Sequence, residues 1–157
     1  MAQTLDDVDR GILHMLQLDA RNASAQDIAD RVGVSASTVR NRIDAMEERG
    51  VIVGYHPHIN YELAGFPLRT EFVVTASPEA RNQAVEEILG VRGVVDVREM
   101  LTASRNLYVE VVGLSSSDLG RITDAIHEMG HKVESSEILR QHRVQAFDHF
   151  ALGEDID

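Results

Sequence analysis

Three adjacent side chains, Arg40, Asn41 and Arg42, are the clearest candidates for chemistry in this sequence. Arginine can form two hydrogen bonds with guanine, and asparagine can form two with adenine, so the triplet is suited to base edges in the major groove of DNA. Serine and threonine hydroxyls can hold phosphates or bases. Helix rotation decides which arginine enters the groove, and Arg42 is the preferred candidate. The residues expected to contact double-stranded DNA are Ser35, Ser37, Thr38, Arg40, Asn41 and Arg42.

A second pattern, His127-Glu128-x-x-His131, matches the spacing at which two histidines hold zinc and a glutamate activates water. Gly130 falls where the helical spacing stops, so His131 is expected beyond the helix end. A catalytic zinc also needs a third protein ligand and a cleft. We therefore predict no catalytic residues, no metal site and no cofactor, and the sequence does not indicate an enzyme.

Capping residues predict the helices that position the DNA-contacting side chains. Asp6 with Asp9, and Ser24 with Asp27, have the spacing of capping boxes, and Ser35 can cap a third helix. The apolar spacing after Asp6 predicts a first helix to about residue 18. Residues 24–49 then have the form of a helix-turn-helix, whose third helix repeats apolar residues at Val39, Ile43 and Met46.

Glycines and short extended runs follow this pattern. Gly33 can supply the left-handed turn between the second and third helices, and Gly50 a C-terminal stop. Residues 51–55 predict a small strand or wing. We assign residues 1–61 to a winged helix-turn-helix domain.

The second half predicts an α+β, ferredoxin-like domain over residues 62–152, in the order β-α-β-β-α-β. The expected elements are strand 68–75, helix 78–89, strand 94–101, strand 106–113, helix 117–129 and strand 133–143. Two helices should cover one face of a four-stranded antiparallel sheet. The valines of these strands suffice to cover both faces, which predicts an apolar open face and self-association. They are Val73, Val95, Val97, Val109 and Val111.

Composition limits the environment of the protein. The formal net charge is -11, but residues 1–50 hold six arginines against nine acidic residues, so the acid excess lies mostly outside the predicted DNA-binding domain. Lys132 is the single lysine, which is typical of proteins from halophilic organisms. No apolar run has the roughly 20 residues of a membrane span, and we expect a cytoplasmic protein. Residues 153–157 predict a disordered acidic tail.

The chain resembles the Lrp/AsnC family of feast-or-famine regulators. The first motif is Leu5-Asp6-x-x-Asp9-x-x-Ile12-Leu13. The second runs from Ile28-Ala29-x-x-Val32-Gly33-Val34-Ser35 through Ser37-Thr38-Val39 to Arg42-Ile43, and the third is Glu48-x-Gly50-Val51-Ile52-x-Gly54-Tyr55. The resemblance implies a transcriptional regulator that forms homodimers, and octamers as a larger assembly, through its second domain.

The resemblance also implies a small-molecule effector, typically an amino acid, bound between dimers. The family's Gly-x-x-Asp or Gly-x-x-Asn loop corresponds to residues 103–106, where Ala103 replaces the glycine. Alanine resists positive φ, which puts effector binding in question. The alternatives are a metal-responsive regulator and an effector-independent architectural DNA binder. The residues expected to contact an effector are Thr102, Ala103, Ser104, Asn106, Ser135 and Ser136.

Overall fold

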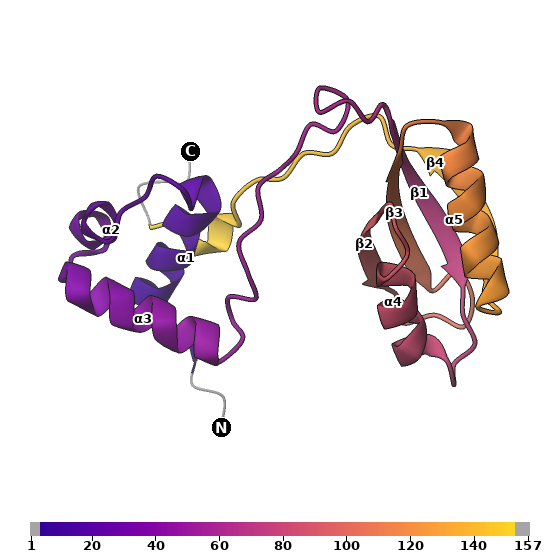
Figure 1. The fold of residues 1–157 in the computed structure, drawn as a ribbon. Coiled ribbons are helices and arrows are strands. Elements are labelled where there is room, and N and C mark those ends of the chain that lie inside the picture. Colours follow the sequence, from indigo (N-terminus) through magenta and orange to yellow (C-terminus); the bar gives the residue numbers. More distant parts are fainter. Residues whose placement is uncertain (1–3, 153–157) are drawn as a thin grey trace. The chain divides into compact units, whose positions relative to one another are not determined.

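The chain forms two units, and the computed structural model describes residues 4–152 of it (Figure 1). One unit contains residues 4–57 and 143–152, and the other contains residues 58–142. The chain therefore passes from the first unit to the second and returns. Within residues 4–152, no helix combines the length and the apolar character needed to cross a membrane.

The first unit contains three helices, and the predicted caps begin all of them. They are α1 (Asp7–Asp19), α2 (Ala25–Val32) and α3 (Ala36–Glu48). Asp6 and Ser24 form capping boxes at α1 and α2, and the Ser35 hydroxyl accepts a hydrogen bond from the Thr38 amide at α3. Gly33 ends α2 at φ 75°, in the left-handed region that favours glycine. The predicted helix-turn-helix is confirmed. The buried core is formed by Ile12, Leu13, Ile28, Ala29, Val39 and Met46.

The segment after α3 differs from the prediction. Residues 51–60 form no strand, so of the small strand or wing expected at residues 51–55 only the strand is wrong. The segment is fixed on α3 by other bonds, because the Val51 and Ile52 amides donate to the Met46 carbonyl at 2.8 and 3.2 Å. The Tyr55 hydroxyl also donates to Glu47 Oε1 at 2.8 Å.

The returning C-terminal segment packs on α1 (Figure 1). A short 3-10 helix (Asp148–Phe150) contacts α1, and Phe150 packs against the apolar core of the first unit. The Phe147 amide donates to Gln17 Oε1 at 3.1 Å. A Cβ on Gly11 would lie 2.7 Å from Val32 Cγ1 and 3.2 Å from Leu152 Cδ2, so glycine in α1 permits the close approach of both α2 and the returning segment. The sequence interpretation placed residues 143–152 in the second domain, whereas the structure places them in the first unit.

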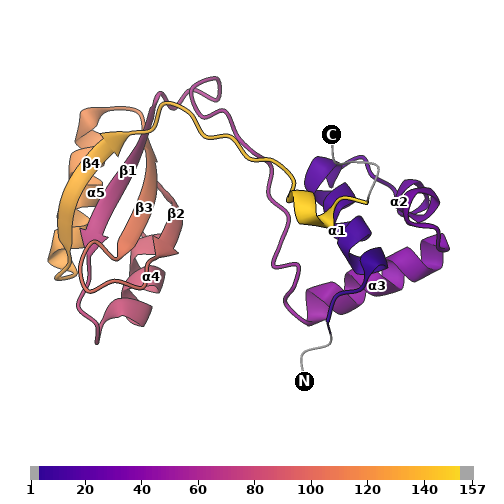
Figure 2. The same cartoon turned by 180° about the vertical axis from the view of Figure 1, so that it is seen from behind.

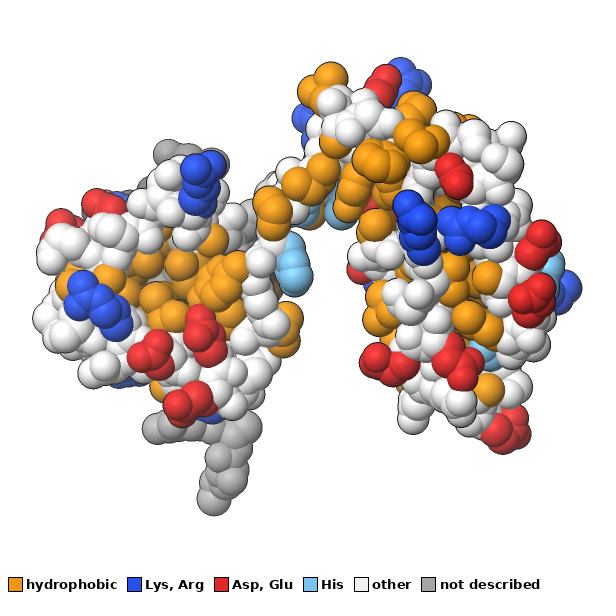
Figure 3. Space-filling model, viewed as in Figure 1, with side chains coloured by type: hydrophobic (Ala, Val, Ile, Leu, Met, Phe, Trp, Pro, Cys, Tyr) orange, Lys and Arg blue, Asp and Glu red, His pale blue; other side chains and the backbone are white. Residues whose placement is uncertain are grey.

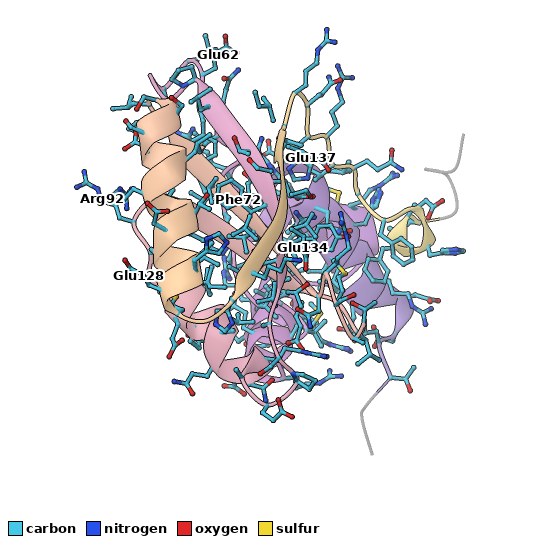
Figure 4. The ribbon with its side chains drawn as sticks, turned by 90° about the vertical axis from the view of Figure 1, so that its right-hand side faces the viewer. Glu62, Phe72, Arg92, Glu128, Glu134 and Glu137 are labelled. Carbon is cyan, nitrogen blue, oxygen red and sulfur yellow. The ribbon has the colours of Figure 1, made fainter. Side chains whose placement is uncertain are left out.

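The second unit has the predicted order of elements. They are β1 (Leu68–Thr75), α4 (Arg81–Leu89), β2 (Val94–Glu99), β3 (Leu107–Gly113), α5 (Ser116–Glu128) and β4 (Lys132–Ile138). The sheet order is β2-β3-β1-β4, and every neighbouring pair is antiparallel. Both helices lie on one face of the sheet (Figures 1 and 2), with Phe72 between the sheet and α5 (Figure 4). The last strand ends at residue 138 rather than 143.

The open face of the sheet carries both apolar and charged side chains, so the predicted apolar open face is present only in part. Alternate residues of a strand point to opposite faces, so Val109 and Val111 share the helix-covered face with Leu107, and Val97 pairs with Val109. The intervening positions of β1 and β3 are charged at Arg69, Glu71 and Glu110 and apolar at Val73 and Val112. The face on which each valine lies depends on strand register, which the number of valines does not determine.

Two ion pairs cross the open face. Arg69 Nε lies 2.5 Å from Glu110 Oε1, linking β1 to β3. Arg98 reaches from β2 over the Tyr108 ring, at 5.9 Å from its centroid, to pair with Glu71 on β1. Glu71 and Glu110 are direct cross-strand neighbours, so each carboxylate needs the arginine that neutralises it. Self-association through this face would therefore bring charged side chains into the contact.

We predict that Phe150→Ala destabilises the first unit, because it removes an aromatic ring from the core that α1 shares with the returning segment. The expected loss is about 1–3 kcal/mol, measured by guanidinium unfolding followed by helical circular dichroism. Val144→Ala is the matched control in the same segment, since Val144 is 59% exposed. Equal stability of the Phe150→Ala variant and wild type would show that the segment is not part of the core.

Candidate nucleic-acid interface

Three hydroxyl groups gather at the N-terminus of α3. The Ser35 Oγ lies 2.9 Å from Ser37 Oγ and 2.8 Å from Thr38 Oγ1, and it accepts a hydrogen bond from the Thr38 amide at 3.1 Å. Ser35 and Ser37 are exposed and Thr38 is half-buried. Free amides and hydroxyls at a helix N-terminus favour bound anions such as phosphate. The structure therefore brings together the predicted hydroxyl contacts.

Arg40 and Asn41 are exposed on α3. Within residues 4–152, Arg40 forms no ion pair. The burial of Val39 and Met46 fixes the inward side of the helix, because residues seven apart lie on the same face. The two predicted base-contacting side chains are consequently on the solvent side of α3, where a DNA groove could reach them.

Arg42 has a different environment from Arg40. Its Nη1 donates to Asp6 Oδ2 at 2.8 Å and to Asp9 Oδ1 at 3.1 Å. The other oxygens of these carboxylates accept the capping-box bonds, with the Asp9 amide donating to Asp6 Oδ1 and the Asp6 amide to Asp9 Oδ2. Arg42 therefore links α3 to the first turn of α1. The sequence analysis identified the Asp6–Asp9 cap but not its bond to Arg42, because the three residues meet only in the folded unit.

The same bonds change the pKa of Asp6. Hydrogen bonding by the Asp9 amide, followed by the hydrogen bond from Arg42, holds the pKa of the Asp6 carboxyl below its ordinary value of 3.8. At Tyr55, in the segment after α3, burial and the hydrogen bond to Glu47 raise the hydroxyl pKa to about 12. At Arg42, the two carboxylates raise the pKa of the guanidinium, with the hydrogen bond to Asp6 as the largest cause. The two carboxylates thus favour the charged form of Arg42.

Asn106, an expected effector contact, forms its side-chain hydrogen bonds within the second unit. Its side chain is completely buried, its Oδ1 accepts from the Ala76 amide at 2.9 Å, and its Nδ2 donates to the Ala76 carbonyl at 2.8 Å. Both ends of the amide group therefore hold β3 to the end of β1. Thr102, Ala103 and Ser104 are exposed in the loop before Asn106.

The backbone of the loop at Ala103 agrees with the expectation that alanine avoids positive φ. Among residues 4–152, the non-glycine residue at positive φ is Arg105, at 50°, so Ala103 does not occupy the left-handed region. The Arg105 amide donates to Thr75 Oγ1 at 2.8 Å, and Arg81 Nη2 donates to the Thr102 carbonyl at 3.0 Å. These bonds hold the loop without a glycine at position 103.

The two serines of β4 differ in environment. The Ser135 Oγ is buried and has no hydrogen-bond partner within residues 4–152, whereas Ser136 is exposed. The neighbouring Glu134 accepts a hydrogen bond from Thr75 Oγ1 at 2.9 Å. Lys132 and then Thr75 lower the pKa of the Glu134 carboxyl. This part of β4 thus lies beside the loop that Arg105 and Thr75 hold.

The histidine motif does not form a metal site in the described part of the chain. α5 ends at Glu128, and Gly130 has φ 86°, which confirms that His131 lies beyond the helix. His127 Nε2 accepts from the Val133 amide at 3.3 Å, while His131 is 6% exposed. Residues 4–152 contain no cluster of three histidine, cysteine or acidic residues that could hold a metal ion.

Comparison with known proteins tests the identity of the chain. Residues 5–53 match a family model for winged helix-turn-helix DNA-binding domains. An uncharacterised HTH-type transcriptional regulator of Pyrococcus horikoshii is 35% identical over 117 residues, which cover 74% of this chain and 73% of that protein. The chain belongs to the Lrp/AsnC family of HTH-type transcriptional regulators. It is therefore a DNA-binding transcriptional regulator, and its family is not one of enzymes.

Solved structures of the Lrp/AsnC family share the fold. The leucine response regulatory protein LrpA of Mycobacterium tuberculosis aligns with a TM-score of 0.77 at 25% identity, covering 94% of this chain and 100% of that chain. AsnC of Escherichia coli aligns with a TM-score of 0.68 at 21% identity, covering 92% and 98% of the two chains, which shows likeness of fold. The predicted fold class, a winged helix-turn-helix followed by an α+β domain, is confirmed.

We predict that acid weakens the first unit through Asp6. Because the folded pKa of Asp6 is below 3.8, its contribution to stability is complete above that pH and is lost as pH falls through the lower, folded pKa. Asp6→Asn should reduce the slope of unfolding free energy against pH in this range, measured by urea unfolding. Asp7→Asn is the charge-matched control. Equal slopes for Asp6→Asn and wild type would contradict this role.

Proposed function

We propose that this Lrp/AsnC-family regulator reads specific promoter sequences with the N-terminal half of α3. The observation that carries the proposal is the exposed group of Arg40 and Asn41 beside the hydroxyls of α3. Arg40 and Asn41 would contact base edges, and Ser35, Ser37 and Thr38 would contact phosphates or bases. Residues 1–61 act as the DNA-binding domain in this proposal.

Arg42 takes a positioning role in the same proposal. Its guanidinium is engaged with two carboxylates, one of which, on Asp9, is buried. A charge held in this way contributes little to neutralising a phosphate, but it fixes α3 against the first turn of α1. The sequence favoured Arg42 over Arg40 for DNA contact, and the hydrogen bonds of Arg42 support the reverse order.

We predict that Arg40→Gln weakens DNA binding directly, whereas Arg42→Gln lowers the stability of the first unit. Loss of a phosphate contact lowers the slope of log affinity against log salt by about one, and loss of a base contact costs about 1–3 kcal/mol and relaxes specificity. Arg40→Gln should show one of these effects without loss of fold stability. Arg42→Gln should leave the slope unchanged and lower the unfolding free energy by about 1–3 kcal/mol, because Asp9 loses its charged partner.

The measurement is a titration of upstream DNA and random DNA over a series of salt concentrations. Arg10→Gln removes the same charge from the same unit, on α1, and serves as the matched control. If the Arg40→Gln variant binds DNA like wild type at every salt concentration, Arg40 does not contact DNA. Absence of any preference of the wild type for its own upstream region would sink sequence-specific binding.

We infer further that the regulator works as a homodimer, with octamers as a larger assembly, formed through residues 58–142. One recognition helix covers few base pairs, so a dimer must place two helices about 34 Å apart to read successive major grooves. Any change in assembly then changes promoter occupancy, since both helices must bind together. The ordered second unit of the described chain and its likeness to the mycobacterial LrpA fold support this inference.

A small effector, with amino acids as the first class to test, is proposed to bind beside the loop before β3. Thr102, Ala103 and Ser104 are exposed there, and Ser135 and Ser136 lie on β4. The Ser135 hydroxyl supports the proposal, because a buried hydroxyl without a protein partner can donate to a ligand. Asn106 would shape the site through Ala76 rather than contact the effector.

We predict that Ser135→Ala abolishes amino-acid binding without destabilising the protein. Removing an unsatisfied buried hydroxyl should leave the unfolding free energy unchanged or raise it by about 1 kcal/mol. Isothermal calorimetry against the common amino acids gives the affinity, and urea unfolding gives the stability. If no amino acid produces heat with wild type, the regulator is effector-independent. If a ligand binds wild type and Ser135→Ala equally well, Ser135 is not a contact.

A further inference from the structure

A hollow lies at the end of the second unit that is remote from the loop at residues 102–105. Its volume is about 520 Å³, within the range of roughly 300–1,000 Å³ that small-molecule sites occupy. Val112 and Gly113 at the end of β3, together with Leu114, form part of its wall. Asn106 immediately precedes β3, so the hollow and the proposed effector loop lie at opposite ends of the same strand.

One wall of the hollow is an apolar turn formed by residues 59–66. The Phe66 amide donates to the Tyr61 carbonyl at 2.8 Å, which closes the turn. The guanidinium of Arg69 lies 5.6 Å from the centroid of the Tyr61 ring, and Arg69 is itself paired with Glu110. The wall is therefore built by defined contacts. Phe66 is 43% exposed and Val95 is 41% exposed, so apolar surface faces the opening.

The opposite rim of the hollow is basic. Arg92 and Arg121 line it, and Arg121 Nη2 donates to the Arg92 carbonyl at 2.9 Å, which holds the Arg121 side chain over the loop before β2. Basic side chains lie beside apolar ones near the start of α5 (Figure 3), and Arg92 extends outward beside that helix (Figure 4). Within residues 4–152, neither arginine forms an ion pair.

Asp118 also lines the hollow, but its carboxylate is used in the fold. Asp118 Oδ2 accepts from the Leu114 amide at 2.9 Å and from the Ser115 amide at 3.3 Å, as part of the capping box of α5. The lining carboxylate is therefore engaged with backbone amides, whereas the two lining arginines have no carboxylate partner within residues 4–152. In a chain of net charge -11, this local excess of positive charge favours an anion.

We propose that this hollow is a second ligand site, which binds a small carboxylate with an apolar body and no ammonium group. The carboxylate would pair with Arg121 and Arg92, and the apolar body would lie against Tyr61, Phe66 and Val95. A zwitterionic amino acid fits less well, because its ammonium group would find no free acceptor beside Asp118. The site is thus distinct in ligand class from the effector site proposed on the loop before β3.

The test uses octanoate as the probe and isothermal calorimetry on the full chain. Octanoate should bind wild type, and 2-aminooctanoate, which adds only an ammonium group, should bind about ten-fold more weakly, since each tenfold change is about 1.4 kcal/mol. Arg121→Gln should weaken octanoate binding by about ten-fold or more. Arg140→Gln is the matched control, because Arg140 is exposed in the same unit and does not line the hollow.

A variant that fills the hollow with a larger side chain tests the proposal without changing any charge. Val95→Trp should occupy the hollow and abolish octanoate binding while circular dichroism remains that of wild type. The proposal is overturned if octanoate gives no heat up to millimolar concentrations, if Arg121→Gln and Arg140→Gln bind alike, or if 2-aminooctanoate binds as tightly as octanoate. A change in sedimented mass of ligand-free Val95→Trp would also overturn it, by showing that a second copy of the chain fills the hollow.

Discussion

The bond of one arginine to two carboxylates determines how the DNA-binding unit is built. Asp6 and Asp9 each use one oxygen to cap α1 and the other to hold Arg42 of α3. The start of α1 and the middle of α3 are therefore fixed by the same two side chains. Because Asp9 is buried, loss of the arginine would leave a charge with poor solvation inside the unit. The exposed part of α3 that is proposed to contact DNA is held in place by these bonds.

The second unit uses charge in a different way. Its helix-covered face is apolar, whereas its open face holds Arg69 with Glu110 and Arg98 with Glu71. An assembly formed over this face would gain from complementary charges and from exclusion of water, and its strength would depend on salt. Val73 and Val112 also lie on this face, so such a contact would be partly charged and partly apolar. The charged network also orders Arg69, which supports the turn around Tyr61.

β3 separates two regions with different chemistry. Asn106 lies before its first residue, where hydroxyls and an internal amide define the loop proposed for an effector. Leu114 lies after its last residue, where arginines and aromatic side chains surround a hollow. Binding at the two ends would act on the same strand of the same sheet. If both proposed sites bind their ligands, two classes of small molecule would act on the second unit without sharing contacts.

The sequence by itself determined the helix caps, the turn at Gly33 and the order of strands and helices, because these depend on residues a few positions apart. It also identified Arg40, Asn41 and the hydroxyls of α3, and the family motifs followed from the same local spacing. Only the tertiary structure decided that Arg42 meets Asp6, that Asn106 is bound to Ala76, and that residues 143–152 return to the first unit. The physical reason is distance along the chain. Contacts between residues tens of positions apart depend on how the elements pack. The periodicity of one segment predicts which of its faces is buried, but it does not predict which other segment packs against that face.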